Sequence, residues 1–90
     1  MVRVLLFAAL REAAGGIAEE HVDPGPMTAM LDGLCDRYGE RFRSRLAVAS
    51  VLIDGTVVDR RADVEVSDGA EVALLPPVSG GVADRRGATG

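Results

Sequence analysis

One regular apolar stripe constrains the fold of this chain more than any other feature of its sequence. Between residues 27 and 38 apolar side chains recur at alternating intervals of three and one residues, which is the spacing of one face of an amphipathic helix. The stripe consists of Met27, Met30, Leu31, Leu34, Cys35 and Tyr38. A turn at residues 23–26 precedes it, and Gly39 is a suitable stop. One helix of this kind can cover one face of a small sheet.

Short apolar runs on both sides of this helix predict strands. Residues 2–7 and 71–75 carry apolar side chains on both faces, which is typical of strands in the middle of a sheet, where the two could lie side by side in parallel. Residues 18–22 predict a strand with poorer alternation. Residues 51–53 and 56–58 predict a hairpin, because Asp54-Gly55 between them suits a two-residue turn that needs positive φ at both positions.

The order of these elements indicates the fold class. Strand, strand, helix, strand, strand, strand predicts an α+β domain, with one main helix packed across a mixed sheet of four or five strands. Residues 8–14 predict a short helical turn that ends at Gly15-Gly16, and the stretch with Arg41, Arg43 and Arg45 predicts a polar connection. Residues 59–67 predict an irregular connection. Because 90 residues allow one modest core, we expect a single domain over residues 1–77.

Composition argues against several classes of function. The net charge is −4, all ten basic residues are arginine, and no basic stripe or aromatic platform occurs, so we expect no nucleic-acid binding. Cys35 is the only cysteine, which leaves no internal disulfide and no Cys/His cluster for a metal. With no signal peptide and no membrane span in the sequence, these features predict a cytoplasmic protein.

No catalytic set is recognisable in the sequence. His21 is the only histidine, and no carboxylate or nucleophile stands at a useful spacing from it. Cys35 lies on the apolar stripe of the helix, which favours a small buried side chain over a reactive thiol. No phosphate-binding glycine loop occurs. We therefore expect a protein that is not an enzyme.

The end of the chain is the more informative segment. Pro76 and Pro77 terminate the last strand, because neither residue can donate a ladder hydrogen bond. Residues 78–81 extend this arm and finish with Gly80-Gly81, whose lack of side chains lets the backbone enter a narrow channel of another protein. Residues 82–90 follow as a flexible extension. Such an arm suits a carrier whose chemistry occurs at its own C-terminal carboxyl group.

Three segments together resemble a known family. The runs VRVLLFAALREAAG at residues 2–15, VLIDGTVVD at 51–59 and SDGAEVALLPPVSGG at 67–81 are similar to the MoaD/ThiS sulfur carriers. The resemblance covers residues 2–81 and is closest to the small subunit of molybdopterin synthase. It implies a β-grasp fold, as in ubiquitin, in agreement with the element order.

The resemblance also implies a mechanism. An E1-like adenylyltransferase uses ATP to adenylate the carboxylate of the last glycine, and a sulfur donor then replaces AMP to leave a thiocarboxylate. That sulfur passes to an acceptor, which in this branch is the molybdopterin synthase large subunit. The carrier itself holds no permanent cofactor, since ATP binds to its partner.

Residue by residue, the resemblance assigns most roles to the tail. Gly81 carries the adenylate and then the thiocarboxylate, and Gly80 lets the tail pass through the channel. The residues that direct the tail and contact the partner are Pro76, Pro77, Val78 and Ser79. Phe7 matches an aromatic of the family's opening strand, and it either belongs to the docking surface or is buried in the sheet core.

The chain departs from this pattern after Gly81. Because Val82 follows it, Gly81 has a peptide carbonyl, and an amide cannot form an acyl-adenylate. We therefore predict that a JAMM-type or other protease cleaves between Gly81 and Val82 and removes residues 82–90. Two alternatives stay open. The acceptor pathway could be cysteine, thiazole or secondary-metabolite synthesis, or the chain could be a ubiquitin-like protein modifier or interaction module.

Overall fold

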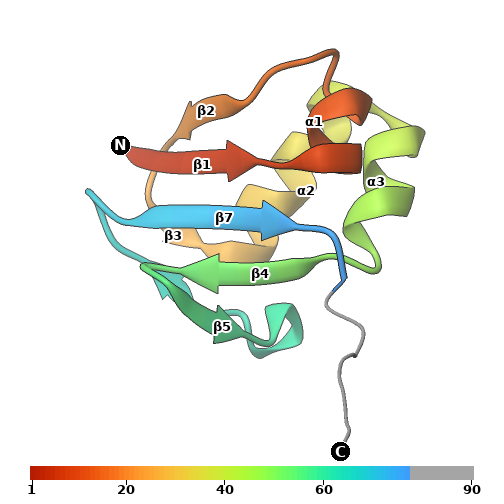
Figure 1. Ribbon diagram of the computed structural model, residues 1–90. Helices are drawn as coiled ribbons and strands as arrows, with labels where there is room; N and C mark the ends of the chain where they lie inside the picture. Colours follow the sequence, from red (N-terminus) through yellow and green to blue (C-terminus); the bar gives the residue numbers. More distant parts are fainter. Residues whose placement is uncertain (78–90) are drawn as a thin grey trace, which may run out of the picture.

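Two strands from opposite ends of the described chain lie at the centre of the sheet. The computed structural model describes residues 1–77 (Figure 1). Within them, β1 (Val2–Leu6) and β7 (Glu71–Leu75) run parallel, as predicted, with Val4 opposite Val72. β2 (Glu19–Val22) pairs antiparallel with the other edge of β1. On the far side, β4 (Ser50–Ile53) pairs antiparallel with β7, and β5 (Thr56–Val58) pairs with β4.

The sheet therefore has five strands in the order β2-β1-β7-β4-β5, which confirms the mixed sheet expected from the sequence. The hairpin between β4 and β5 forms at the predicted turn, where Asp54 and Gly55 have φ values of 49° and 84°. A second, two-stranded sheet pairs β3 (Gly25–Pro26) with β6 (Glu65–Val66). β6 and the 3₁₀ turn η1 (Arg60–Ala62) fall within the connection that was expected to be irregular.

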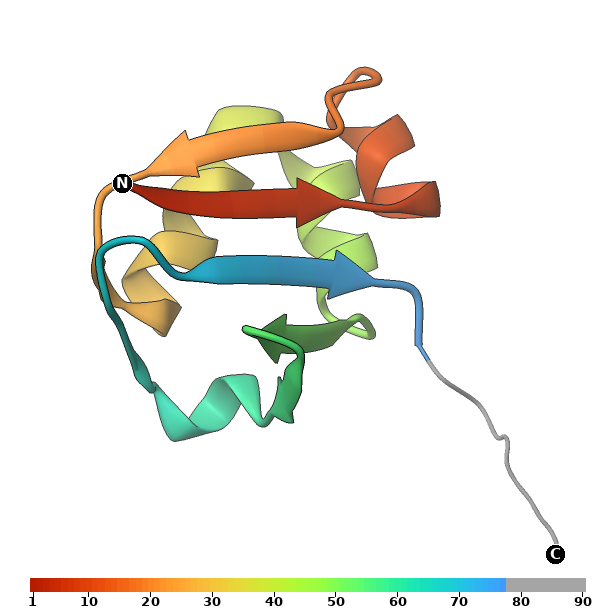
Figure 2. The same ribbon diagram turned by 60° about the vertical axis from the view of Figure 1, so that its left-hand side comes forward.

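Helices cover one face of the sheet, and two of them lie toward the end at which β1 and β7 stop (Figures 1 and 2). α2 (Met27–Tyr38) is the main helix predicted from the apolar stripe, and Tyr38 at its end is half-buried. α2 crosses one face of the sheet (Figures 1 and 2), and the inward residues of β1 belong to the same buried cluster as its stripe. α1 (Ala8–Ala13) follows β1 directly and places Leu10 in the core. Besides the half-buried Tyr38, the residues of the α2 stripe are all buried, namely Met27, Met30, Leu31, Leu34 and Cys35.

The polar connection predicted around Arg41, Arg43 and Arg45 is wrong. These residues belong to α3 (Glu40–Leu46), a helix of seven residues that packs against both α1 and α2. Gly39, with φ of 94°, separates α2 from α3 in a conformation that few other residues adopt. Phe42 and Leu46, four residues apart, face the core and are buried. A helix this short needs only such a pair of apolar residues, which a search for a longer stripe does not detect.

Candidate functional site

One face of the sheet has no helix packed against it. Along β1 the side chains alternate, so that Val2, Val4 and Leu6 are buried beneath the helices while Arg3 and Leu5 point the other way. Residues that lie directly opposite each other on paired strands point to the same face, so the strand register identifies the outward residues of the other four strands. We call this surface the open face. Its outward residues are Arg3, Leu5, Phe7, Glu19, His21, Ser50, Leu52, Val57, Glu71, Ala73 and Leu75.

An apolar row crosses the middle of the open face. Leu5 lies opposite Ala73, Ala73 opposite Leu52, and Leu52 opposite Val57, so that the row spans β1, β7, β4 and β5. Leu5, Ala73 and Leu52 are half-buried, and Val57 is 71% exposed. A contiguous apolar row on an uncovered sheet face is typical of a protein-docking surface.

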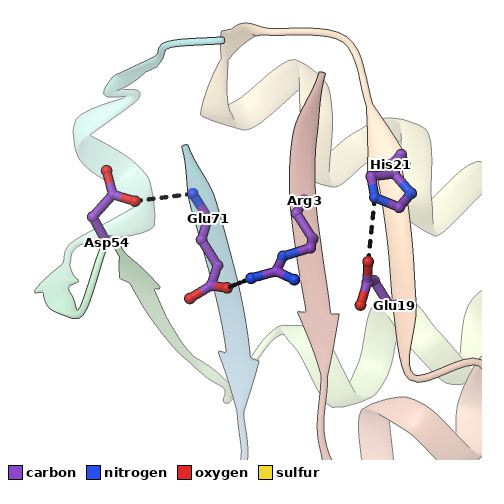
Figure 3. A network of polar contacts seen from close by, with 5 residues as sticks. All are labelled: Arg3, Glu19, His21, Asp54 and Glu71. Carbon is purple, nitrogen blue, oxygen red and sulfur yellow. Dashed lines mark hydrogen bonds and ion pairs between the residues drawn. The ribbon is translucent and has the colours of Figure 1, made fainter. Parts of the chain in front are cut away.

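A charged band borders this row at the end where β1 and β7 begin. Arg3 and Glu71 lie opposite each other in the register and form an ion pair (Figure 3). The Glu71 backbone N–H donates to the Asp54 carboxylate at 3.0 Å. On β2, His21 lies opposite Arg3 and is 3.2 Å from the carboxylate of Glu19, which lies opposite Leu5 at the edge of the row. The open face is therefore polar at one end and apolar in the middle.

The chain leaves the domain at the other end of the open face. Leu75, the last residue of β7, pairs with Ser50, and Pro76 and Pro77 follow as exposed residues, as the tail prediction requires. The Phe7 backbone N–H donates to the Leu74 carbonyl at 3.2 Å, which holds the end of β1 beside this exit. The tail therefore leaves next to the apolar row and away from the charged band.

Phe7 belongs to the open face and not to the core. Its backbone is still extended, so the alternation of β1 continues and turns its ring outward, where the side chain is 38% exposed. Of the two positions considered from the sequence, the structure has the exposed one. A role for Phe7 in docking stays a prediction. The other predicted tail residues, Val78, Ser79, Gly80, Gly81 and Val82, lie outside the described residues.

The remaining candidates from the sequence do not form a reactive site. Cys35 is buried, as predicted, and this burial raises the pKa of its thiol, which disfavours the nucleophilic thiolate. His21 is exposed on β2 beside Glu19. Over residues 1–77, no three His, Cys, Asp or Glu side chains gather in a way that could hold a metal ion. No helix in the same part of the chain is long and apolar enough to cross a bilayer.

Sequence reasoning did not find the open face. Apart from Arg3 and Glu71, the outward residues of β1 and β7 are apolar like the inward ones, so periodicity alone cannot tell which side the helices cover. The weak signal was the pair Arg3 and Glu71, which places charge on one face at the start of each central strand. That signal becomes informative only once the register of β1 with β7 is known.

This arrangement defines a ubiquitin-like β-grasp protein, in which helices cross one face of a mixed sheet and the chain end leaves beside the other. The ThiS family model matches residues 4–81, and the chain belongs to this family of small sulfur carriers and modifiers. No curated protein matches the chain.

Solved structures share the fold. A protein from Pyrococcus furiosus assigned as molybdopterin converting factor subunit 1 is 26% identical, with a TM-score of 0.72 over 86% of this chain and 97% of that one. SAMP1 from Haloferax volcanii is 30% identical, with a TM-score of 0.67 over 89% and 98%. A structure of the BexX/CysO complex from Amycolatopsis orientalis matches with a TM-score of 0.71 and 24% identity, over 90% and 100%, which supports the fold alone.

Proposed function

We propose that this chain is a sulfur carrier for molybdopterin synthesis, active as a thiocarboxylate at Gly81 once residues 82–90 are removed. One observation carries the proposal: β7 runs through the middle of the sheet and delivers Pro76 and Pro77 beside an uncovered apolar row. A partner that docks on the open face is thereby in position to receive residues 78–81. The likeness to the Pyrococcus furiosus protein supports molybdopterin synthesis as the pathway.

The chemistry takes place at the end of the tail. A carboxylate oxygen of Gly81 attacks the α-phosphate of ATP held by an E1-like enzyme, and pyrophosphate leaves. A sulfide-level sulfur donor then attacks the acyl carbon, the bond to AMP breaks, and the thiocarboxylate forms without any change of oxidation state at carbon. The carrier is not the enzyme in these steps, and the acceptor, the molybdopterin synthase large subunit, would take the sulfur in the cytoplasm.

The extension after Gly81 must be removed before this chemistry can occur. Gly81 is joined to Val82 by a peptide bond, and an amide oxygen is not a free carboxylate. The family match ends at residue 81, which supports residues 82–90 as an addition to the conserved carrier unit. A JAMM-type or similar protease that cleaves after Gly81 would supply the carboxylate.

The test compares the full chain with a chain truncated after Gly81. Each is incubated with an E1-like adenylyltransferase, ATP and sulfide, and its intact mass is measured. The truncated chain should gain about 16 Da, as one oxygen is replaced by sulfur, while the full chain should not change. A truncated Gly81→Ala variant is the matched control. It should accept sulfur poorly, because the alanine side chain hinders entry of the tail into the narrow channel of the partner enzyme.

Two results would contradict the proposal. If the full chain gains sulfur without losing residues 82–90, processing is not required. If the truncated chain never forms an adenylate with any E1-like enzyme of its host, the chain acts as an interaction module. Acceptor specificity is tested separately, by supplying the thiocarboxylate to a molybdopterin synthase large subunit and measuring dithiolene formation.

A second candidate is a protein modifier. The 30% identity to SAMP1, a small archaeal modifier protein, supports it. In that case the adenylated Gly81 would be attacked by a lysine amine of a target protein, and the product would be an amide-linked conjugate instead of a thiocarboxylate. Mass spectrometry of host proteins distinguishes the modifier from the sulfur carrier, because only the modifier leaves a remnant of the tail linked to lysine. The other acceptor pathways are tested by a search for sulfur passed to cysteine or thiazole.

A further inference from the structure

The arginine side chains that the structure describes fall into two groups. One group contacts carboxylates and consists of Arg3, Arg37, Arg43 and Arg61. The other group is exposed and has no ion pair or side-chain hydrogen bond within residues 1–77; it consists of Arg11, Arg41 and Arg45. The chain has more acidic than basic residues, so a shortage of carboxylates does not explain why these three arginines have no ion pair in the described part of the chain.

The unpaired group gathers on two helices that pack together. Arg11 is on α1, and Arg41 and Arg45 are on α3, which contacts α1. Both helices lie at the end of the sheet toward which β1 and β7 run (Figures 1 and 2). α1 follows Phe7, and α3 leads to Ser50, which pairs with Leu75 at the end of β7. The group therefore lies at the end of the domain from which the tail leaves.

The placement of side chains around α3 separates the two groups. Phe42 and Leu46 face the core, and Arg43 lies on the flank toward α2, where it is 3.5 Å from Asp36. Arg41 and Arg45 are four residues apart and so share the opposite flank. This flank is turned away from α2, and α3 also packs against α1.

The stability of the helices does not account for these charges. Arg11 and Arg45 lie in the last turns of their helices, where exposed carbonyls favour a cation, but Arg41 lies in the first turn, where they do not. Two like charges four residues apart also repel each other. Of the nearby carboxylates, Glu40 already contacts Arg43, and Glu12 is adjacent to Arg11 in the chain without an ion pair in residues 1–77.

We propose that Arg11, Arg41 and Arg45 form a basic end that binds an acidic segment of a protein partner beside the exit of the tail. The planar guanidinium group matches a carboxylate with two parallel hydrogen bonds, and the chain uses arginine at all ten of its basic positions. A partner on the open face would meet this basic end at the edge nearest the tail. The inference does not depend on sulfur chemistry at Gly81.

A protein segment fits this surface better than nucleic acid. A long polyanion would meet repulsion from the 14 acidic residues of the chain, whereas a short acidic segment contacts the basic end alone. Among residues 1–77, bases would find only one exposed aromatic ring near this group, that of Phe7 on the open face, because Phe42 is a buried residue of α3.

The test uses the full chain labelled with nitrogen-15 and a short synthetic peptide of alternating glutamate and glycine. At low ionic strength, the peptide should shift the backbone amides of α1 and α3 and the Nε resonances of the three arginines. The affinity should fall when salt is raised to about 0.15 M, because screening weakens exposed charge pairs. Arg41→Gln combined with Arg45→Gln should weaken binding about fivefold.

Arg61→Gln is the matched control, because Arg61 is 87% exposed and is already paired with Asp59. It should change the affinity by less than about twofold. The proposal is overturned if no resonance of α1 or α3 shifts at low ionic strength, or if Arg61→Gln weakens binding as much as the double variant. It is also overturned if a thymidine oligonucleotide binds the same residues more tightly than the peptide. Circular dichroism checks that each variant is folded.

Discussion

At the scale of single residues, a half-buried carboxylate joins the edge strand β2 to the main helix. Glu20 accepts hydrogen bonds from the Tyr38 hydroxyl and, at 2.8 Å, from the Arg37 guanidinium, and its side chain is 18% exposed. The bond from Tyr38 is the main reason that the pKa of Glu20 is lowered, and burial opposes it only in part. Burial, followed by the same bond, raises the pKa of Tyr38.

This network predicts an acid-dependent loss of stability. Because the pKa of Glu20 is lower in the folded chain, its stabilisation is complete above the unfolded value of 4.5 and is lost as the pH falls through the folded value. Glu20→Gln should lower the free energy of unfolding by about 1 kcal/mol at pH 7. The difference from the wild type should shrink below about pH 4. Urea unfolding of the wild type and of Glu20→Gln, at pH 7 and below about pH 4, measures this difference in the free energy of unfolding.

Glu19→Gln on the same strand is the control for this prediction. Glu19 is exposed, and its ion pair within residues 1–77 is with the exposed His21, so its substitution should change stability by less than about 0.5 kcal/mol. A difference between Glu20→Gln and the wild type that stays constant from neutral to acid pH would show that the carboxylate charge of Glu20 contributes nothing.

A second residue-scale prediction concerns the junction between β1 and α1. Ala8 has φ of 50°, a left-handed conformation that an alanine side chain disfavours and glycine tolerates. Ala8→Gly should therefore raise the free energy of unfolding by about 0.5 to 1 kcal/mol. Ala9→Gly, the same change one residue later within the helix, should lower it by a similar amount. Denaturant unfolding of both variants decides, and equal losses would mean that Ala8 is not strained.

At the scale of elements, the sequence predicts those whose pattern is long or whose turn is specific. The stripe of α2 and the Asp54-Gly55 hairpin were both correct, because each rests on a local rule that packing does not alter. α3 was missed, since its seven residues contain only Phe42 and Leu46 as buried positions. β3 and β6 were missed as well, because strands of two residues form through tertiary contact and have no periodicity.

The candidate site divides in the same way. Pro76 and Pro77 predict from the sequence alone where the last strand ends and the tail begins, because they have no N–H group to donate to the sheet. The apolar row could not be predicted, because Leu5, Ala73 and Leu52 are distant in the chain and meet only through the register of three strands. The basic end depends likewise on the packing of α1 against α3.

α3 provides a test of how much a short helix contributes to the core. Phe42 is fully buried, and its ring lies 5.3 Å from that of Tyr38. Phe42→Ala should lower the free energy of unfolding by about 3 kcal/mol or more, because it removes buried apolar area and leaves a cavity. Ser44→Ala, on the exposed side of the same helix, should change it by less than about 0.5 kcal/mol. Equal, small effects in urea unfolding would show that α3 is only loosely attached.

At the scale of the whole molecule, the two faces of the sheet have separate tasks. The covered face contains the core residues of β1, β7 and β4 and supplies stability. The open face keeps an apolar row in contact with solvent, at a cost that burial by a partner would reverse. Because β7 is a central strand, a partner that covers this row, as we propose, would also fix the direction in which it receives the tail.

We therefore expect that a charge placed on the apolar row lowers the rate of thiocarboxylation but leaves the free energy of unfolding nearly unchanged. Val57 ends the row and is 71% exposed, so Val57→Glu should leave urea unfolding nearly unchanged while it places an unpaired charge in the proposed partner interface. The rate at which an E1-like enzyme converts the chain truncated after Gly81 to its thiocarboxylate should fall about tenfold, which is equivalent to about 1.4 kcal/mol.

The matched control is Val64→Glu, the same change at an exposed valine beside β6, outside the apolar row. It makes the net charge more negative by the same amount, so it removes general electrostatic repulsion as an explanation. If both variants slow thiocarboxylation equally, overall charge is responsible and the row is not the docking surface. If only Val57→Glu does so, and urea unfolding shows that both variants remain folded, the loss belongs to the open face, because the net charge and the tail are the same in the two variants.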